Sequence, residues 1–424
     1  MARDTRRKTP RWLAFPWLVL CLAALSISAG GNWSIALDLS ASPSHTEDAS
    51  IAVDSSGRIH AVWSEGGEVL HRLDAGGGWS APSHVASGTS PDLAADAAGR
   101  VHLVFANRFA DSDDIYFMSW LPAGGWGLPV NLSEGVGVSS SPRVAIGPDH
   151  SFAVVWSARS AESEFIYVAR SADGLLWSML PIPHAHGTHP VVALTSSANL
   201  LVAWQGPYDD VGSPSEIFLS QQTGSQWTLP VDVSASPELN SCLPWLSTGQ
   251  GEAYVAWQEA GPWGQAVCLS GTTNGQWNMP QKRSGSDQAF APAMGLDRAG
   301  DGHVVWTTGS AIQHTTWSPS TGIWQPIEDV CVGQIGPRGA RIALQGSLHV
   351  IWLAQASTDN DDVYYSTRPA VEPSPTPSAT ETATATPTRV VSATPTSTAT
   401  ATPLLSPPWR LVLPCILMNS QPMP

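Results

Sequence analysis

The stretch Ile59-His60-Ala61-Val62-Trp63 decides the fold, because versions of it return along the whole chain. Each version is a short apolar run that ends on an aromatic residue, and there are seven: Trp63, Phe105, Trp156, Trp204, Trp257, Trp306 and Trp352. Their spacings are 42, 51, 48, 53, 49 and 46 residues. Two further strand-like runs fit between successive copies, so each repeat holds four short strands, which is typical of a propeller blade.

A second series of tryptophans follows glycine-rich turns at the same period: Trp33, Trp79, Trp126, Trp177, Trp227, Trp277 and Trp324. The two series together account for 13 of the 20 Trp residues. A large ring at the same place in every blade can fill the wedge between neighbours. We therefore interpret these tryptophans, and the recurring His60, His102, His303 and His349, as structural.

The phase of the repeats predicts how the ends of the domain meet. The first strand, Trp33 to Ser40, is a lone fourth strand, and the last, Val363 to Ser366, is a third strand with no fourth after it. The N-terminal strand can therefore complete the last blade and remove the exposed edges. We predict an all-β, seven-bladed β-propeller closed by the N-terminal strand, with a six-bladed ring as the alternative.

Composition divides the rest of the chain. Residues 1–29 have a basic start and the apolar run Trp12–Leu25, which is typical of a secretory signal; a single uncleaved membrane helix is the alternative. The propeller is expected over 33–369. A Pro/Thr-rich disordered linker over 370–408 leads to a short apolar C-terminal segment, 409–424, which is similar to bacterial sorting segments. We expect a secreted or cell-surface monomer, attached to the cell envelope through its tail.

Cysteine spacing argues against a zinc site, and the net charge argues against a nucleic-acid-binding surface. Cys242, Cys268 and Cys331 fit no zinc pattern and suit small buried positions, and whether they form disulfides stays open. From Trp33 to Ala370 there are 13 basic and 32 acidic residues, a net charge near −19. Such a domain would repel phosphate, so we expect no nucleic-acid partner.

One turn resembles a known family. Ser171-Ala172-Asp173-Gly174-Leu175-Leu176-Trp177 resembles the Asp box of sialidase-like (BNR-repeat) β-propellers with one residue missing, and Leu73–Trp79 is a looser copy. The resemblance covers about residues 33 to 369. It implies the propeller fold but little about activity, because the Asp box of that family is a structural turn away from the active site. Sialidases have six blades, so a count of seven departs from them.

The innermost strand of each blade carries the candidate site. The position after a proline-like residue, which faces the channel mouth, reads Ser50, Asp92, Arg143, Val191, Pro244, Ala293 and Arg341. Purely structural positions should look alike, and these do not. The loops that enter the innermost strands and the loops between the second and third strands share one face of the ring, which we call the top face. We expect Asp92, Arg143 and Arg341 to point into one opening on this face, where two guanidiniums suit a carboxylate or sulfate. Ordinary solvated salt bridges are the alternative.

Loops on the same face add Arg108, Tyr208, Asp209 and Arg338 to the predicted ligand-binding residues. Arginine, carboxylates and aromatic rings together suit a glycan-type or other polar ligand. The rival hypothesis is a glycoside hydrolase of the sialidase type (exo-sialidase-like) that uses top-face arginines and carboxylates. The family's Arg-Ile-Pro segment is absent, and Tyr364 and Tyr365 fall in a third strand. We therefore favour binding over catalysis.

No cofactor is predicted, although the acidic loops could hold Ca²⁺, which prefers several oxygen ligands. Three imidazoles occur within six residues at His184, His186 and His189, the spacing of a weak metal candidate. We expect them in a top-face loop, where a polar loop with no metal is the favoured interpretation.

Overall fold

The computed structural model describes residues 32–109, 112–160, 163–207, 214–262, 264–285, 288–357 and 360–369. The predicted signal, linker and C-terminal segment lie outside these residues, so their roles and the domain boundaries remain predictions. Within the described part of the chain, no helix is long and apolar enough to cross a membrane.

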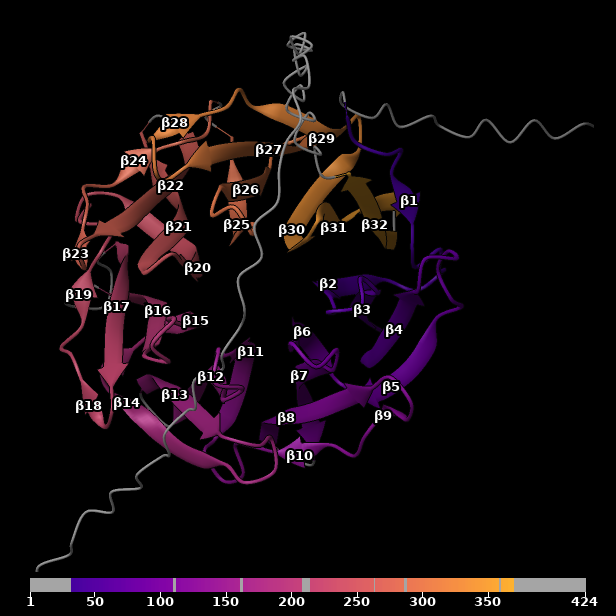
Figure 1. The fold of residues 1–424 in the computed structure, drawn as a ribbon, viewed down its shortest axis with the longest axis horizontal. Coiled ribbons are helices and arrows are strands. Elements are labelled where there is room, and N and C mark those ends of the chain that lie inside the picture. Colours follow the sequence, from indigo (N-terminus) through magenta and orange to yellow (C-terminus); the bar gives the residue numbers. More distant parts are fainter. Residues whose placement is uncertain are drawn as a thin grey trace, which may run out of the picture. The chain divides into compact units, whose positions relative to one another are not determined.

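Seven antiparallel sheets form a ring, with the first strand of each sheet nearest the centre (Figure 1). The seven-bladed prediction is confirmed, and the six-bladed alternative is wrong. Blades 1 to 3 consist of β2 Thr46–Val53, β3 Ile59–Glu65, β4 Glu68–Asp74 and β5 Ser83–Ser87; β6 Thr89–Ala95, β7 Val101–Phe109, β8 Ser112–Leu121, β9 Gly125–Trp126 and β10 Val130–Asn131; and β11 Val138–Ile146, β12 Phe152–Ser160, β13 Ser163–Ser171 and β14 Ser178–His186.

The remaining blades follow the same plan, with short outer strands. Blades 4 to 7 consist of β15 Thr188–Leu194, β16 Leu200–Pro207, β17 Ser215–Thr223, β18 Gln226–Trp227 and β19 Val231–Asp232; β20 Asn240–Gly249, β21 Glu252–Gly261, β22 Gly264–Thr273, β23 Gln276–Trp277 and β24 Gln281–Lys282; β25 Phe290–Leu296, β26 Gly302–Thr307, β27 Ala311–Ser318, β28 Ile323–Trp324 and β29 Glu328–Val332; and β30 Ile335–Gln345, β31 Ser347–Ser357 and β32 Asn360–Arg368, completed by β1 Leu37–Asp38.

The N-terminal strand closes the ring as predicted. Strand β1 pairs with β32 through Leu37 opposite Tyr365 and Asp38 opposite Tyr364, and the two strands lie side by side in Figure 1. Ser40 then accepts a hydrogen bond from the backbone of Val363 at 2.9 Å. Its hydroxyl donates to buried Asp362 at 3.0 Å. The first and last parts of the domain therefore share one sheet.

The same serine bond recurs within other blades, which shows that β1 copies an ordinary fourth strand. Ser133 accepts from the backbone of Ile115 at 2.8 Å, and Ser234 accepts from Ile217 at 2.8 Å. Both serines also donate to a buried carboxylate one residue earlier on the third strand, Asp114 or Glu216. In blades 2, 4 and 7 the sequence signal is a serine two residues after the short outer strand: Ser133, Ser234 and Ser40.

The second strand of each blade supplies the packing predicted from the repeats. Its terminal aromatic residue is at most 1% exposed in all seven blades: Trp63, Phe105, Trp156, Trp204, Trp257, Trp306 and Trp352. Because these rings are the largest fully buried side chains, they fix the spacing between blades. The three described cysteines are free thiols, with Cys268 and Cys331 buried in this packing.

The recurring histidines are buried structural residues. His60 contacts His71 at 3.1 Å, and His303 contacts His314 at 3.1 Å, in both cases between ring nitrogens. His349 Nδ1 lies 2.7 Å from the hydroxyl of Tyr365. Burial lowers the pKa of His60, His303 and His349 to about 4. These imidazoles are therefore neutral at neutral pH.

Deleting Trp33 to Ser40 should open the ring and expose two strand edges. We expect the shortened protein to aggregate or to melt far below the full-length protein, measured by circular dichroism. Ser40→Ala should cost about 1 kcal/mol or somewhat more, as a buried hydrogen-bonding group does. Ser133→Ala, which removes the same bond inside blade 2, should cost a similar amount. An unchanged melting temperature for the deletion would refute closure.

Acid should destabilise the propeller through its buried histidines. Their folded pKa lies below the ordinary value, so the unfolded chain binds more protons, and stability falls as pH drops from about 6.5 toward 4. His349→Gln, which cannot titrate but can accept from Tyr365, should flatten this fall in thermal unfolding. His84→Gln, at an exposed ion pair with Glu68, is the control and should leave the slope unchanged. Equal slopes in all three proteins would contradict the assignment.

Candidate functional site

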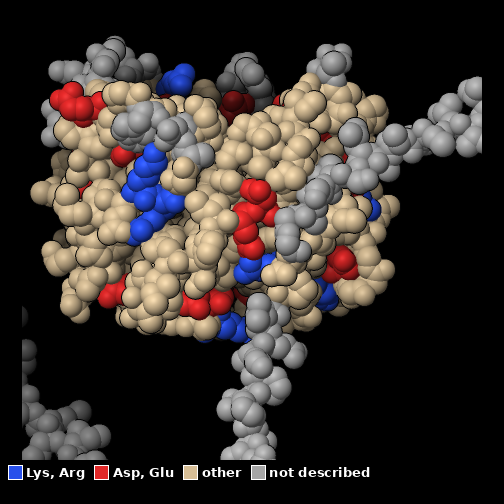
Figure 2. Space-filling view, turned by 90° about the horizontal axis from the view of Figure 1, so that it is seen from above, with Lys and Arg blue, Asp and Glu red and all other residues tan. Residues whose placement is uncertain are grey.

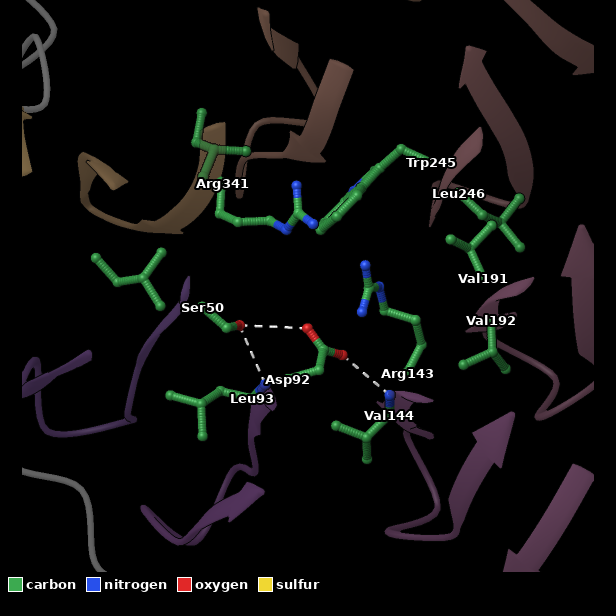
Figure 3. Close-up of a pocket in the computed structure, with 12 residues that line it drawn as sticks. Ser50, Asp92, Leu93, Arg143, Val144, Val191, Val192, Trp245, Leu246 and Arg341 are labelled. Atoms are coloured by element: carbon green, nitrogen blue, oxygen red, sulfur yellow. Dashed lines mark hydrogen bonds between the residues drawn. The ribbon is translucent and has the colours of Figure 1, made fainter. Parts of the chain in front are cut away.

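A cavity of about 170 Å³ opens at the centre of the ring, and the predicted residues line it together. Ser50, Asp92, Arg143 and Arg341 each lie opposite the residue that precedes the buried aromatic residue of the next strand. This common register directs their side chains toward the centre of the ring (Figure 3). A wider cavity of about 380 Å³, nearer the strand starts, continues upward and shares Arg143 and Arg341.

Asp92 is buried and hydrogen-bonded through both of its carboxylate oxygens. Its carboxylate accepts a hydrogen bond from the backbone of Val144 at 3.0 Å and one from Ser50 at 3.2 Å. Burial raises the pKa of Asp92, while Arg143, Val144, Arg341 and Ser50 oppose the rise. Asp92 therefore ties blade 2 to blade 3 and supplies negative charge beside the arginines.

Arg143 retains most of its donors. One of its terminal nitrogens donates to the carbonyl of Pro142 at 2.9 Å, while its Nε is buried without a partner. Figure 3 shows its guanidinium directed toward the centre of the cavity. Among the described residues, no carboxylate forms an ion pair with Arg143 or Arg341. The predicted salt-bridge alternative is therefore not what the geometry shows.

Arg341 is held against an aromatic ring. Its guanidinium carbon lies 4.9 Å from the centre of the Trp245 ring, and one nitrogen donates to the carbonyl of Ala340 at 3.1 Å. The Trp245 indole donates to the carbonyl of Met294 at 2.7 Å, which fixes the ring. Burial and the Arg143 charge lower the pKa of Arg341 to about 10, so it is protonated at neutral pH.

Trp245 is the site residue that the sequence analysis missed. We call the position of Asp92 and Arg143 in their strands the ring position, and the sequence predicts Pro244 there in blade 5. In the structure Trp245 holds the ring position, because it lies opposite Ala256, the residue before Trp257. The correction has a simple signal, because Asp92 and Arg143 also follow a proline directly. Trp245 lines both cavities, whereas Pro244 lines only the upper one.

A β-bulge in each of the seven innermost strands shapes the mouth. The pairing shifts register just before the ring position, as between Thr89 and Asp92 in blade 2. In blades 2 to 7 the bulge holds a residue in the left-handed region, with φ between 45° and 62°: Ser90, Ser141, His189, Leu243, Ala291 and Gly339. Bulges change the direction in which side chains point. The six bulge residues form a second row above the ring position, and all of them line the upper cavity.

The other predicted binding residues do not join the cavity. Arg338 forms an ion pair with Asp361 at 2.7 Å and lines neither cavity. Arg108 lies on β7 opposite Asp113, and its side chain is not described. Tyr208 and Asp209 lie outside the described residues, so their role stays a prediction.

The three histidines that are close in sequence lie on two different strands of the structure. The prediction that they share a loop is wrong: His184 and His186 lie on β14, the outer strand of blade 3, and His189 on β15, the innermost strand of blade 4. The tight turn at Gly187 sends them to different strands. Among the described residues, no group of three or more His, Cys, Asp or Glu side chains could hold a metal ion.

The Asp-box-like turn is present as a hydrogen-bonded loop. Asp173 accepts from the backbone of Leu175 and Leu176 at 2.8 and 3.0 Å, and the indole of Trp177 donates to the carbonyl of Gly174 at 3.2 Å. The turn follows β13 at the outer part of blade 3. It stabilises the blade and takes no part in the central cavity.

Two solved structures with TM-scores above 0.5 support the fold, and a third is similar at a lower score. A protein of unknown function from Dyadobacter fermentans has a TM-score of 0.51 and 12% identity, covering 79% of this chain and 98% of its own. The polysaccharide lyase Uly1 has a TM-score of 0.51 and 10% identity, covering 77% and 90%. Trypanosoma rangeli sialidase has a TM-score of 0.46 and 10% identity, covering 76% and 55%.

No protein-family model matches the chain, and no curated protein matches it in sequence. At these low identities the structural likeness shows the fold alone, so membership of the Asp-box family remains a prediction.

Asp92→Ala should destabilise the protein, because it removes the negative charge nearest two partly buried guanidiniums and leaves the Val144 N–H without its acceptor. We expect a loss of about 3 kcal/mol in denaturant unfolding. The same substitution in an Arg143→Gln/Arg341→Gln background should cost less, since the charge attraction is already gone. Equal costs in both backgrounds would show that Asp92 acts through the backbone bond alone.

Proposed function

We propose that this protein binds an acidic glycan-type ligand at its top face, with the ligand's carboxylate or sulfate between Arg143 and Arg341. The observation that carries the proposal is a pair of guanidiniums that line one cavity and form no ion pair with a described carboxylate. Two positive charges at one site repel each other, and a bound anion relieves that repulsion. Arginine is also the residue best suited to paired bonds with such anions.

The shape and lining of the cavities support a polar ligand. The upper cavity of about 380 Å³ presents Asp48, Ser90, Ser141 and His189, which can bond hydroxyl groups. Trp245 adds an aromatic face shared by both cavities. A cavity with a few convergent polar groups is the usual form of a small-ligand site. The polysaccharide lyase among the similar structures acts, by its name, on a polysaccharide, and the proposal carries that ligand class to this chain.

The charge distribution supports a local anion site over a nucleic-acid surface. Figure 2 shows basic and acidic residues in small separate groups on one side of the molecule, with most of the surface neither basic nor acidic. A nucleic-acid partner would require many phosphate contacts along a basic surface. Two partly buried arginines that line one cavity suit a single acidic group instead.

The proposal includes location and assembly. The signal-like start of the sequence supports a secreted or cell-surface protein, attached to the envelope through its tail. We propose a monomer with no required cofactor; Ca²⁺ in the acidic loops is a further option that the sequence leaves open.

The glycoside hydrolase alternative gains little support from the geometry. Such an enzyme needs two free carboxylates, or a tyrosine with a glutamate, beside the arginines. Asp48 and Asp92 line the cavities, but Asp92 is bonded to Val144 and Ser50. No described tyrosine lines either cavity, and Tyr364 and Tyr365 lie on β32. Binding is therefore the better-supported function.

Arg143→Gln/Arg341→Gln should abolish acidic-ligand binding while leaving the fold intact. Each lost charge-assisted hydrogen bond is worth about 1.5–3 kcal/mol, so affinity should fall by roughly 100-fold or more. The measurement is isothermal titration calorimetry near pH 8 with glucuronate and a sulfated monosaccharide, with glucose as the neutral comparison.

Arg338→Gln is the matched control, because it removes a top-face arginine that is already paired with Asp361. It should bind like the unmodified protein. If the double variant keeps its affinity, or if it unfolds, the arginines are structural and the proposed anion site is wrong. Binding of glucose as tightly as glucuronate would also contradict the proposal.

A further inference from the structure

His189 lies at the mouth of the arginine site and away from the other two histidines. It lines the upper cavity together with Arg143, Arg341 and Trp245. Part of the His189 surface is exposed, so a ligand that enters from the top face can reach the imidazole, although the cavity walls remove some of the ring's hydration. In blade 4 it occupies the second-row bulge position that Ser90 and Ser141 occupy in blades 2 and 3.

The backbone holds this imidazole in place. His189 has a φ of 49° and precedes Pro190, a combination that few residues adopt without support from their surroundings. Its Nδ1 lies 3.0 Å from the hydroxyl of Thr188. With Nδ1 engaged, Nε2 remains available to the cavity.

The charges around His189 come from blades 1 and 3. Arg143 on β11 repels its protonated form, while Glu164 on β13 and Asp48 on β2 favour it. Desolvation is the largest effect, and together these groups lower the pKa of His189. The ligand-free site therefore holds a neutral imidazole beside two permanent cations near neutral pH.

We propose that His189 is a third anion-contacting residue of this site and that it takes up a proton when an acidic ligand binds. The inference rests on the proposed function, because the anion must sit beside Arg143 for its charge to reach His189. A bound carboxylate or sulfate cancels part of the repulsion from Arg143 and attracts a protonated imidazole. Nε2–H then donates to the ligand.

The consequence is fixed by linkage. If the bound anion raises the proton affinity of His189, protonation of His189 must raise ligand affinity by the same factor. Affinity should therefore increase as pH falls from about 8 to about 5, the range in which histidine titrates. A one-unit rise in the pKa on binding corresponds to about a tenfold gain in affinity across this range.

The effect of His189 on the pH dependence of binding must be distinguished from that of the other charged groups at the site. Arg341 keeps its proton throughout this range, since its pKa is about 10. Asp92 has a raised pKa, and its protonation would also favour an anion as pH falls. Asp48 and Glu164 also face His189 and attract its protonated form. The test therefore depends on substituting His189 itself and on counting protons.

The experiment titrates inorganic sulfate and glucuronate into the full chain at about pH 8 and pH 5.5, in buffers of different ionisation enthalpy. Neither probe changes its charge appreciably in this range, so the proton that is taken up comes to the protein. We expect net proton uptake and about tenfold tighter binding at the lower pH for the unmodified protein. His189→Gln should remove the proton uptake that belongs to the imidazole and flatten the rise in affinity, leaving only the part that comes from Asp92.

His184→Gln is the matched control, since His184 lies on β14 and lines neither cavity. It should keep the full pH slope. If His189→Gln also keeps the slope and the uptake, the proton goes elsewhere and the inference is wrong. Failure of the proposed function is distinguishable, because the Arg143→Gln/Arg341→Gln variant would then bind normally at about pH 8, where His189 is neutral. No binding of either probe to the unmodified protein would overturn both.

Discussion

The pairing of β1 with β32 is the constraint on which the rest of the structure depends. The C-terminal end of the domain supplies only three strands of the last blade. Strand β1, from the N-terminal end, forms the missing outer strand and so joins the two ends of the domain. Ser40 and Asp362 repeat there the buried contact that Ser133 and Asp114 make inside blade 2. The closing joint thus uses the same chemistry as the other blades, so no disulfide or metal is needed to hold the two ends.

Closure matters for the site because the site belongs to no single blade. Ring residues reach forward to the next innermost strand: Ser50 accepts from Leu93, Asp92 accepts from Val144, and Trp245 donates to Met294. The cavity therefore exists only while all seven strands keep their spacing. Arg143 and Arg341 are brought together across this ring by the packing of the whole domain, although almost two hundred residues separate them in sequence.

Periodicity made the fold and part of the site predictable. Repeats reveal blade number, ring phase and the register of Asp92, Arg143 and Arg341, because equivalent positions in a propeller face the same way. They do not reveal non-equivalent details. In blade 5 the repeat was aligned on Pro244 itself instead of on Trp245, the residue that follows the proline as Asp92 and Arg143 do. The turn at Gly187 separated His189 from His184. Neither the backbone bond to Asp92 nor the Arg341–Trp245 stack leaves a signal in the sequence, since both depend on distances between blades.

The acidic character of the domain and its basic centre are compatible for a physical reason. A net charge near −19 should disfavour the approach of an anion, but charges at the surface are screened over about 8 Å in physiological salt. Arg143 and Arg341 lie in the channel, where lower polarity strengthens their attraction for a partner. Asp92 lowers the cost of keeping both guanidiniums protonated. Its two oxygens accept hydrogen bonds from Val144 and Ser50, and among the described residues it forms no ion pair with either arginine. The site is therefore charged in advance and open to an anion.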